Sequence, residues 1–312
     1  MWLQSYMHGW CQYVKAKRGK SSDLNCITVD IPQCGPISAK IFTYGTNSIS
    51  KKTICPNDEK CNISKYSDDT RILYRHDNNA ISSDQNQYNK IVTTVAELSA
   101  TNNLKLNETK CQEVTFQIRA TKSTRQFSSI LEINGKDIPK SEEVKYLGLI
   151  ISSNLTWSTH INWLTRKLNI TIKNFTLILP YLEYKTKIEI FNTYILSVLL
   201  YGSEVWGFSI TQSDRKKLRK IISCFSKISS INKVYLIKLA NEQFEKKYRK
   251  RIEKIMTNND HPLNDKLKQS KQLRHNTRRQ RKVLFCRTQT YQSTFIPQST
   301  LLISDQKKFE FL

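Results

Sequence analysis

A change in hydrophobic periodicity near residue 151 most constrains the fold of this chain. Beyond that point, apolar residues recur at the three- and four-residue spacing of one face of an amphipathic helix. The spacing predicts a helix that ends at Pro180, a second helical stripe, a third helix at about 213–228, and a further helix that ends at Pro262. The first stripe consists of Ile161, Leu164, Leu168, Ile172 and Phe175, and the second of Ile188, Phe191, Ile195, Val198 and Val205.

The part before residue 151 has short extended segments and turns in place of long helical stripes. A single helix is predicted at 87–101, and the dipeptide Asn134-Gly135 favours a hairpin turn. The strand-like runs lie at 28–31, 72–74, 111–118 and 127–151. The pattern predicts an α+β fold, with an antiparallel sheet and a helix first and a bundle of helices after it.

The sequence therefore predicts three parts. Residues 1–151 form the mixed part, residues 152–260 the helical part, and residues 261–312 a basic, irregular tail with weak periodicity. A chain of 312 residues is long enough to bury a sizeable core.

Positive charge is concentrated in one section of the chain. The whole sequence has 50 Lys and Arg against 26 Asp and Glu, a net charge of +24, and residues 213–287 hold 23 of the former and 6 of the latter. A basic surface of this kind neutralises phosphates, which predicts a nucleic-acid partner. Two alternatives stay open: an AT-biased coding sequence that raises the lysine content, and a solvated helix face or nuclear-localisation run.

Three dense basic runs supply the candidates for contact with a nucleic-acid backbone. Aromatic residues such as Phe225 and Tyr235 interleave with them, as in surfaces that bind single strands. The candidates are Arg215, Lys216, Lys217, Arg219, Lys220, Lys246, Lys247, Arg249, Lys250, Arg251, Arg278, Arg279, Arg281 and Lys282.

The sequence shows neither a membrane span nor a secretory signal. No apolar run approaches the roughly 20 residues that cross a bilayer, and the first residues lack the basic and apolar regions of a signal peptide. The eight cysteines are scattered and are expected to be reduced thiols. Cys55, Cys61 and His76 lack the close cysteine pair of a zinc site. We therefore expect an intracellular protein, nuclear or cytoplasmic, with no membrane partner.

Two adjacent carboxylates, Asp68 and Asp69, are the strongest candidates for chemistry. They lie between a short strand-like piece at 62–64 and the clearer strand at 72–74, which places them at or beside a hairpin turn. Neighbouring side chains of a strand point to opposite faces, so only a turn lets both approach one pair of metal ions. Mg²⁺ ions held by carboxylates stabilise phosphoryl transfer. Taken alone, an Asp-Asp turn is more often a surface feature.

Further motifs flank the two aspartates, and their order and spacing resemble the reverse transcriptases of non-LTR, LINE-like (jockey-type) retrotransposons. The matching segments are 31–42 (the Pro-Gln-Gly box), 66–70 (the Tyr/Phe-Ala-Asp-Asp box), 103–110 (the next palm segment), Tyr146-Leu147-Gly148 (the primer-grip hairpin), and 155–161 with 201–207 (the segment after the palm).

The resemblance implies an RNA-directed DNA polymerase that transfers nucleotides by a two-metal mechanism. Its implied partners are an RNA template, a DNA primer and dNTPs, and its implied cofactor is Mg²⁺. Residues 1–151 would form a partial palm, and the helices after them a thumb-like region. The implied roles are metal binding and catalysis for Asp68 and Asp69, nucleotide and template contact for Pro32, Gln33, Gly35 and Lys110, and primer grip for Tyr146, Leu147 and Gly148.

Departures from the family pattern point to a chain that is inactive alone. The family's third metal-binding carboxylate lies upstream of the segment that residues 2–6 resemble, as does the fingers region, so we expect an N-terminally truncated polymerase. Asp30 and Cys34 stand where the family has Gly, and Ser67 replaces Ala. The alternatives are a non-catalytic basic nucleic-acid-binding module and a decayed gene product.

Overall fold

The computed structural model describes residues 11–13, 22–26, 38–76, 81–116, 131–265, 267, 299 and 311–312. The chain divides into two compact units. The first unit comprises Met1–Glu113 and Arg119–Lys140, and the second comprises Val114–Ile118 and Ser141–Leu312. Each unit has a hydrophobic core of its own. The three-part division of the sequence stays a prediction.

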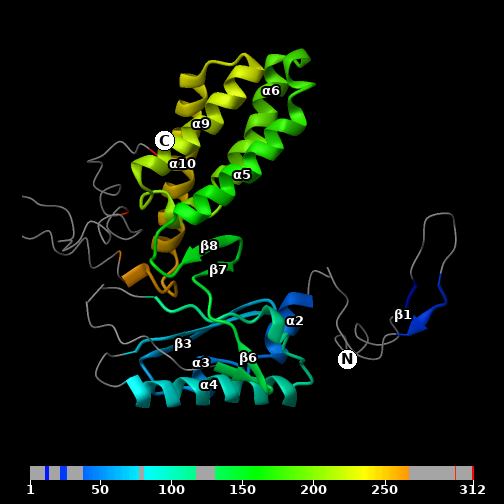
Figure 1. Cartoon of the computed structure of the whole chain (residues 1–312), viewed down its shortest axis with the longest axis vertical. Coiled ribbons are helices and arrows are strands. Elements are labelled where there is room, and N and C mark those ends of the chain that lie inside the picture. The colour runs from blue at the N-terminus through cyan, green and yellow to red at the C-terminus, as the bar shows by residue number, and fades with distance from the viewer. Residues whose placement is uncertain are drawn as a thin grey trace, which may run out of the picture. The chain divides into compact units, whose positions relative to one another are not determined.

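The first unit combines short hairpins with one long helix (Figure 1). Its strands pair antiparallel as β1–β2, β3–β4 and β5–β6. Its elements are β1 (Cys11–Gln12), β2 (Asn25–Cys26), α2 (Ser38–Gly45), α3 (Lys51–Ile54), β3 (Cys61–Tyr66), β4 (Asp69–Tyr74), α4 (Ile81–Thr101), η1 (Glu108–Lys110), β5 (Leu131–Ile133) and β6 (Lys136–Ile138). This mixture of helices and small antiparallel sheets confirms the α+β class.

Helix α4 supplies the apolar surface on which the hairpins of the first unit pack. Ile91 packs in one cluster with Cys61 of β3, and Val92 packs in another with Leu131 and Ile138 of the β5–β6 hairpin. The predicted helix at 87–101 and the predicted Asn134-Gly135 turn are therefore confirmed, and the helix begins six residues earlier than its apolar stripe indicates. The predicted strand at 28–31 lies outside the described residues.

The second unit is a hairpin followed by helices (Figure 1). Its elements are β7 (Glu143–Tyr146), β8 (Leu149–Ser152), α5 (Ser158–Phe175), η2 (Leu179–Tyr181), α6 (Tyr184–Ile190), the π-helical η3 (Phe191–Leu196), α7 (Ser197–Leu199), α8 (Ser203–Trp206), α9 (Gln212–Ser229) and α10 (Lys233–Thr257). Across the described ranges, no helix combines the length and the apolar character needed to cross a bilayer.

The core of the second unit forms from the helical stripes that the sequence predicts. Ile161, Leu164 and Leu168 of α5 are almost fully buried, together with Phe225 of α9 and Phe244 of α10. Helix α9 begins at a cap in which the Thr211 hydroxyl accepts a hydrogen bond from the Asp214 amide at 3.1 Å. The third predicted helix is therefore confirmed, and the first is present but ends at Phe175, before the predicted end at Pro180.

The second predicted stripe is helical but not continuous. It passes through α6, the π-helical η3 and α7, and then breaks at Gly202, whose backbone is left-handed with φ +60°. The break rotates α8 relative to the preceding helix, so Val205 is 55% exposed, while Trp206 is fully buried. The expectation that Val205 continues the buried stripe is wrong. Hydrophobic periodicity assumes one continuous helix and does not show that a left-handed residue interrupts it.

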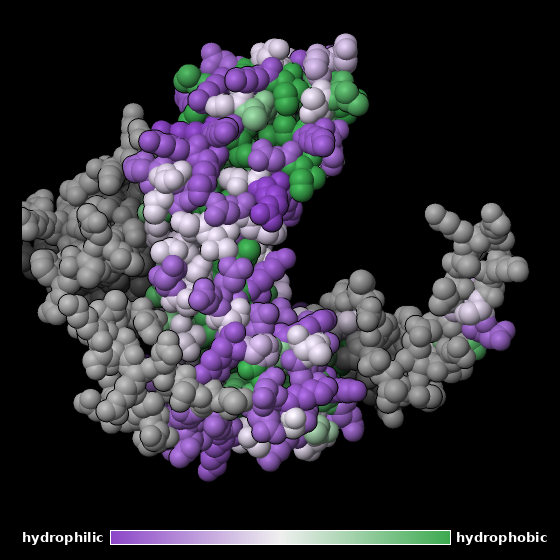
Figure 2. Space-filling view, in the orientation of Figure 1, coloured by the Kyte–Doolittle hydropathy of each residue, from purple (hydrophilic) through white to green (hydrophobic). Residues whose placement is uncertain are grey.

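Exposed apolar side chains gather at the α6 end of the second unit (Figure 2). Leu177 is 83% exposed and Ile178 is 51% exposed in the connection between α5 and α6. The 3-10 helix η2 follows with the buried Leu179 and then Pro180, so the chain leaves the α-helical spacing that buries apolar residues elsewhere in this unit.

Gly202→Ala is expected to destabilise the second unit by about 2–3 kcal/mol. A left-handed backbone costs an L-residue roughly 1–2 kcal/mol, and the added methyl group must also displace Leu149. An ideal Cβ at this position would lie 2.8 Å from Leu149 Cδ2. The measurement is urea unfolding followed by circular dichroism.

Gly45→Ala is the matched control, because a Cβ there would meet no atom within 4 Å and the residue has no positive φ. Its effect is expected to stay within about 0.5 kcal/mol. Equal effects of the two substitutions would contradict the close packing of Gly202 on Leu149.

Candidate active site

The β3–β4 hairpin carries the two aspartates at its tip. The strands pair in a register that places Cys61 opposite Tyr74, Ile63 opposite Ile72, and Tyr66 opposite Asp69. Alternation along the strands directs one face of the hairpin to the core around Ile91 and leaves the other face to solvent. Asp69 shares the outer face with Tyr66, which is 64% exposed.

The turn itself consists of Ser67 and Asp68. Ser67 has a left-handed backbone with φ +54°, a conformation found at the first position of tight hairpin turns. Both Asp68 and Asp69 are exposed. The turn therefore presents two neighbouring carboxylates to solvent, as the sequence predicts, and carboxylate oxygens are ligands suited to Mg²⁺.

Two lysines fix the hairpin within the first unit. Lys65 donates hydrogen bonds to the backbone carbonyl and the hydroxyl of Thr46, and burial lowers the pKa of its ammonium group. Lys60 lies 2.8 Å from Asp84 in the first turn of α4, where the carboxylate is almost fully buried. These contacts hold the base and middle of the hairpin while its tip stays exposed.

The other predicted nucleotide-site residues are only partly described. Lys110 is the last residue of η1 and is exposed, and no hydrogen bond or ion pair joins it to Asp68 or Asp69. Pro32, Gln33 and Gly35 lie outside the described residues. Within the described ranges, no group of three or more His, Cys, Asp and Glu side chains could hold a metal ion.

The predicted primer-grip residues lie at the tip of the β7–β8 hairpin, where Tyr146 ends β7 and Leu147 and Gly148 form the turn. Leu147 and Gly148 both have positive φ, of 46° and 79°, which suits a two-residue hairpin turn. The Tyr201 hydroxyl donates a hydrogen bond to the Leu147 carbonyl at 2.8 Å. A Cβ at Gly148 would lie 3.1 Å from the Tyr201 ring, so glycine allows the ring to approach this closely.

A buried histidine attaches the same hairpin to α5. His160 is 2% exposed, and its Nδ1 accepts a hydrogen bond from the Ile150 amide at 3.4 Å. Its ring stacks on Trp163 and meets Trp206 edge-on, at centroid distances of 5.9 and 5.7 Å. Burial lowers the pKa of His160 to about 4, so the ring is neutral at neutral pH.

The segment at 201–207 thus contacts the β7–β8 hairpin through Tyr201, and further contacts fix the segment itself. Trp206 Nε1 donates to the Tyr201 carbonyl at 3.2 Å, and Glu204 pairs with Lys247 at 3.0 Å. Sequence reasoning recognised this segment and 155–161 as motifs but assigned no role to Tyr201 or His160. Both residues lie in motifs that follow the hairpin in sequence, and this position is the signal that could have indicated a contact with the hairpin.

Most basic residues of α9 are either held by hydrogen bonds or exposed, and Arg219 is half-buried. Arg215 donates hydrogen bonds to the backbone carbonyls of Phe311 and Gly207, and Lys217 donates to Asn162 and Asp214. Lys216, Lys220 and Lys227 are exposed on one side of the helix at spacings of four and seven residues. We call these three residues the α9 lysine stripe.

No exposed acid of α9 offsets the α9 lysine stripe. The helix has one carboxylate, Asp214, which is 1% exposed and accepts hydrogen bonds from Ser158 and Thr211 at 2.8 Å. Burial raises the pKa of Asp214, but the hydrogen bonds from Thr211, Ser158 and Lys217 outweigh that effect and lower the pKa below its usual value. Asp214 stays charged but hidden, so the outward charge of this helix is positive.

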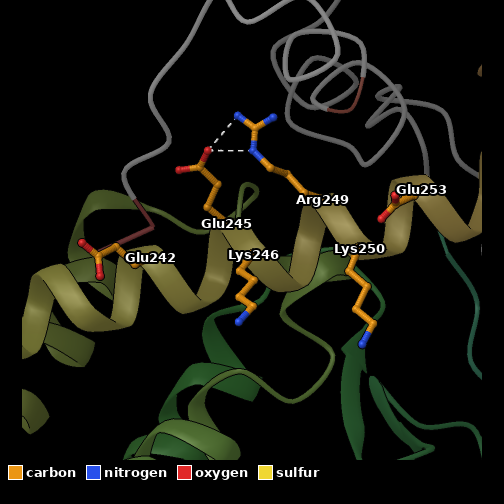
Figure 3. A pocket seen from close by; sticks show the side chains of 6 residues that line it. All are labelled: Glu242, Glu245, Lys246, Arg249, Lys250 and Glu253. Carbon is orange, nitrogen blue, oxygen red and sulfur yellow. Dashed lines mark hydrogen bonds and ion pairs between the residues drawn. The ribbon is translucent and has the colours of Figure 1, made fainter.

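The basic residues of α10 are interleaved with acids instead. A surface hollow of about 560 Å³ is lined by Lys246, Arg249 and Lys250 together with three glutamates, Glu242, Glu245 and Glu253. Arg249 pairs with Glu245 at 2.8 Å, whereas Lys246 and Lys250 point away from that pair (Figure 3). Lys247 pairs with Glu204, and Arg251 is exposed. The candidates Arg278, Arg279, Arg281 and Lys282 lie outside the described residues.

Comparison with known proteins identifies the class. Residues 2–151 match the reverse transcriptase (RNA-dependent DNA polymerase) family. The match covers 150 of the 312 residues and includes the β3–β4 hairpin with Asp68 and Asp69.

Two curated relatives define the type more closely. Both are named RNA-directed DNA polymerase from mobile element jockey. The Drosophila melanogaster protein is 23% identical over 206 residues, covering 64% of this chain and 22% of the relative. The Drosophila funebris protein is 26% identical over 216 residues, covering 65% and 23%. These relatives confirm the predicted resemblance to jockey-type, non-LTR reverse transcriptases.

The chain spans less than a quarter of the length of these two relatives. No solved structure matches it.

The buried His160 is expected to make the stability of the second unit depend on pH. An unfolded histidine titrates near 6.5 and the folded one near 4, so the unfolded state binds the extra proton between these values. The free energy of unfolding should therefore fall by about 3 kcal/mol as the pH drops from 6.5 to 4. Urea unfolding at a series of pH values measures it.

His160→Gln should remove this slope, although it lowers stability at neutral pH. Asp214 has a lowered pKa in the folded state, so its contribution to the free energy of unfolding is lost only when the pH falls below 3.8, the usual pKa of an aspartate. Asp214 therefore does not affect the slope between pH 6.5 and 4. An unchanged slope in the variant would contradict the assignment to His160.

Proposed function

We propose that this chain is part of an RNA-directed DNA polymerase of a jockey-type mobile element, in which Asp68 and Asp69 bind Mg²⁺ for nucleotidyl transfer. The observation that carries the proposal is the pair of exposed carboxylates at the tip of the β3–β4 hairpin, within the residues that match the family. An RNA template, a DNA primer and dNTPs are the proposed partners. Residues 1–151, which comprise the first unit and most of the β7–β8 hairpin of the second, correspond to a partial palm, and the helices after them to a thumb-like region.

The donor set at the hairpin tip fits Mg²⁺. Carboxylate oxygens are the hard ligands that this ion prefers. Bound Mg²⁺ would stabilise the charge that develops on the transferred phosphoryl group. Asp68 and Asp69 would hold and orient the ion, and the contacts of Lys65 and Lys60 would fix the hairpin that carries them.

The chain alone is proposed to be inactive. Two carboxylates on an exposed turn leave most of the Mg²⁺ coordination to water, so the ion is held weakly. Positioning supplies much of the rate enhancement in phosphoryl transfer, and a loosely held ion does not provide it.

Primer extension on an RNA template tests both parts of this proposal. The purified chain and its Asp68→Asn variant are expected to incorporate no nucleotide in Mg²⁺. A chimera, in which residues 61–74 replace the corresponding hairpin of a jockey polymerase, should extend the primer. Asp68→Asn in the chimera should reduce that rate by at least about 100-fold, the size of effect expected from losing one charge-stabilising contact.

Two results would contradict the proposal. Asp68-dependent extension by the chain alone would show that its metal site is complete. A chimera that loses no activity on Asp68→Asn would show that this carboxylate does not serve the reaction.

A second candidate function is non-catalytic binding of nucleic acid through the α9 lysine stripe. The observation that favours it is the exposed row of Lys216, Lys220 and Lys227 on a helix whose one acid is buried. Contacts of this kind are electrostatic and independent of base sequence. Both functions can belong to one chain.

Removal of the stripe should weaken the salt dependence of binding. Each phosphate contact contributes about 0.7 to the slope of log K against log salt for a single strand and about 0.9 for duplex DNA. Lys216→Gln/Lys220→Gln/Lys227→Gln is therefore expected to reduce the slope by about 2–3. Fluorescence anisotropy with a labelled duplex at several salt concentrations measures it.

The control changes the same number of charges elsewhere on the second unit, as Lys173→Gln/Lys185→Gln/Lys238→Gln. It should alter the slope by less than about one unit. Equal effects of the two triple variants would show that net charge, and not the α9 lysine stripe, determines binding.

A further inference from the structure

A pocket of about 360 Å³ lies within the second unit, beside the turn of the β7–β8 hairpin. Its volume falls at the small end of the range for ligand sites, about 300–1,000 Å³. We call it the Trp163 pocket. The lining residues that matter for its chemistry are Lys145, Trp163, Lys167, Val198 and Tyr201.

Two ammonium groups meet at one indole ring in this pocket. Lys145 Nζ lies 5.2 Å and Lys167 Nζ 5.3 Å from the centre of the Trp163 ring. Both lysines are exposed, and neither forms an ion pair with a carboxylate of the described residues. Each cation is attracted by the ring, but the two repel each other, so an anion between them would be stabilised by both.

Apart from Ser197, the remaining walls are apolar or aromatic, and their rings are held in place. His160 stacks on Trp163 with an interplanar angle of 23° and fixes the indole from one side. The hydrogen bond from Tyr201 to Leu147 fixes the phenol ring. Val198, from α7, adds an aliphatic surface. An anion that also carries a planar or apolar group would therefore fit better than a bare anion.

We propose that the Trp163 pocket binds one nucleotide of a single-stranded nucleic acid, with the phosphate between Lys145 and Lys167. The sugar and base then pack against Tyr201 and Val198, because aromatic side chains stack on bases of any sequence. The inference rests on the proposed function in taking nucleic acid as the partner, and it adds a specific subsite that is lined in part by Gly148 of the β7–β8 turn and is separate from the β3–β4 turn and the α9 lysine stripe.

Fluorescence anisotropy with a short labelled oligothymidylate tests the subsite on the full chain. Lys145→Gln/Lys167→Gln should weaken binding by at least about tenfold, since hydrogen bonds to charged groups are stronger than those between neutral groups. The control Lys173→Gln/Lys185→Gln makes the same change in charge elsewhere on this unit and should weaken binding by less than about threefold.

Val198→Phe provides a second variant that keeps every charge. The larger ring fills part of the pocket, so it should also weaken oligothymidylate binding by about tenfold. Thermal melts of each variant confirm folding before binding is compared. Wild-type affinity in both Val198→Phe and the double lysine variant would overturn the proposal.

Three competitors distinguish the occupant. Thymidine monophosphate should displace the labelled strand better than inorganic phosphate, and an unlabelled strand should do so better still. If inorganic phosphate competes as well as thymidine monophosphate, the proposed contact with sugar and base is wrong. If the unlabelled strand competes no better than the monophosphate, a strand is not the occupant. If the two double lysine variants lose the same amount of affinity, the Trp163 pocket is not the binding site, and the proposed function still stands. If the wild-type chain does not bind the strand at all, both the pocket and nucleic-acid binding are wrong.

Discussion

Burial of one face of the β3–β4 hairpin against α4 is the interaction on which the candidate metal site depends. Ile63 and Ile72 lie opposite each other in the register and face the core with Ile91. Because side chains alternate along a strand, this burial determines that the turn after it points Asp68 and Asp69 into solvent. A one-residue shift of register would exchange the two faces, so the packing of a few apolar residues fixes where the carboxylates lie.

The second unit uses the same principle with different contacts. Its hairpin is short, and it is attached through single side chains: His160 accepts the Ile150 amide, and Tyr201 donates to the Leu147 carbonyl. These groups lie in the segments 155–161 and 201–207, which follow the hairpin in sequence. His160 and Tyr201, which hold the hairpin, also line the Trp163 pocket. The same side chains therefore stabilise the hairpin and form part of the candidate binding surface.

Much of this arrangement could be predicted from the sequence, because strong local patterns determine it. The α5 and α9 stripes, the Asn134-Gly135 turn and the exposed position of Asp68 follow from periodicity and turn chemistry. The break at Gly202 could not be predicted, since one left-handed residue leaves the apolar spacing unchanged. Pairing partners could not be predicted either: the sequence shows Arg215 and Lys216 as equal charges, but the fold buries part of one and exposes the other.

The most direct test of the central claim is paramagnetic broadening of backbone amide signals by Mn²⁺, which substitutes for Mg²⁺ at oxygen ligands. The account predicts broadening centred on Tyr66 to Thr70 that disappears in Asp68→Asn/Asp69→Asn, with the amides of α9 unaffected. Broadening that is absent from the β3–β4 turn, or that persists there in the double variant, would contradict the assignment of Asp68 and Asp69 as the metal-binding pair.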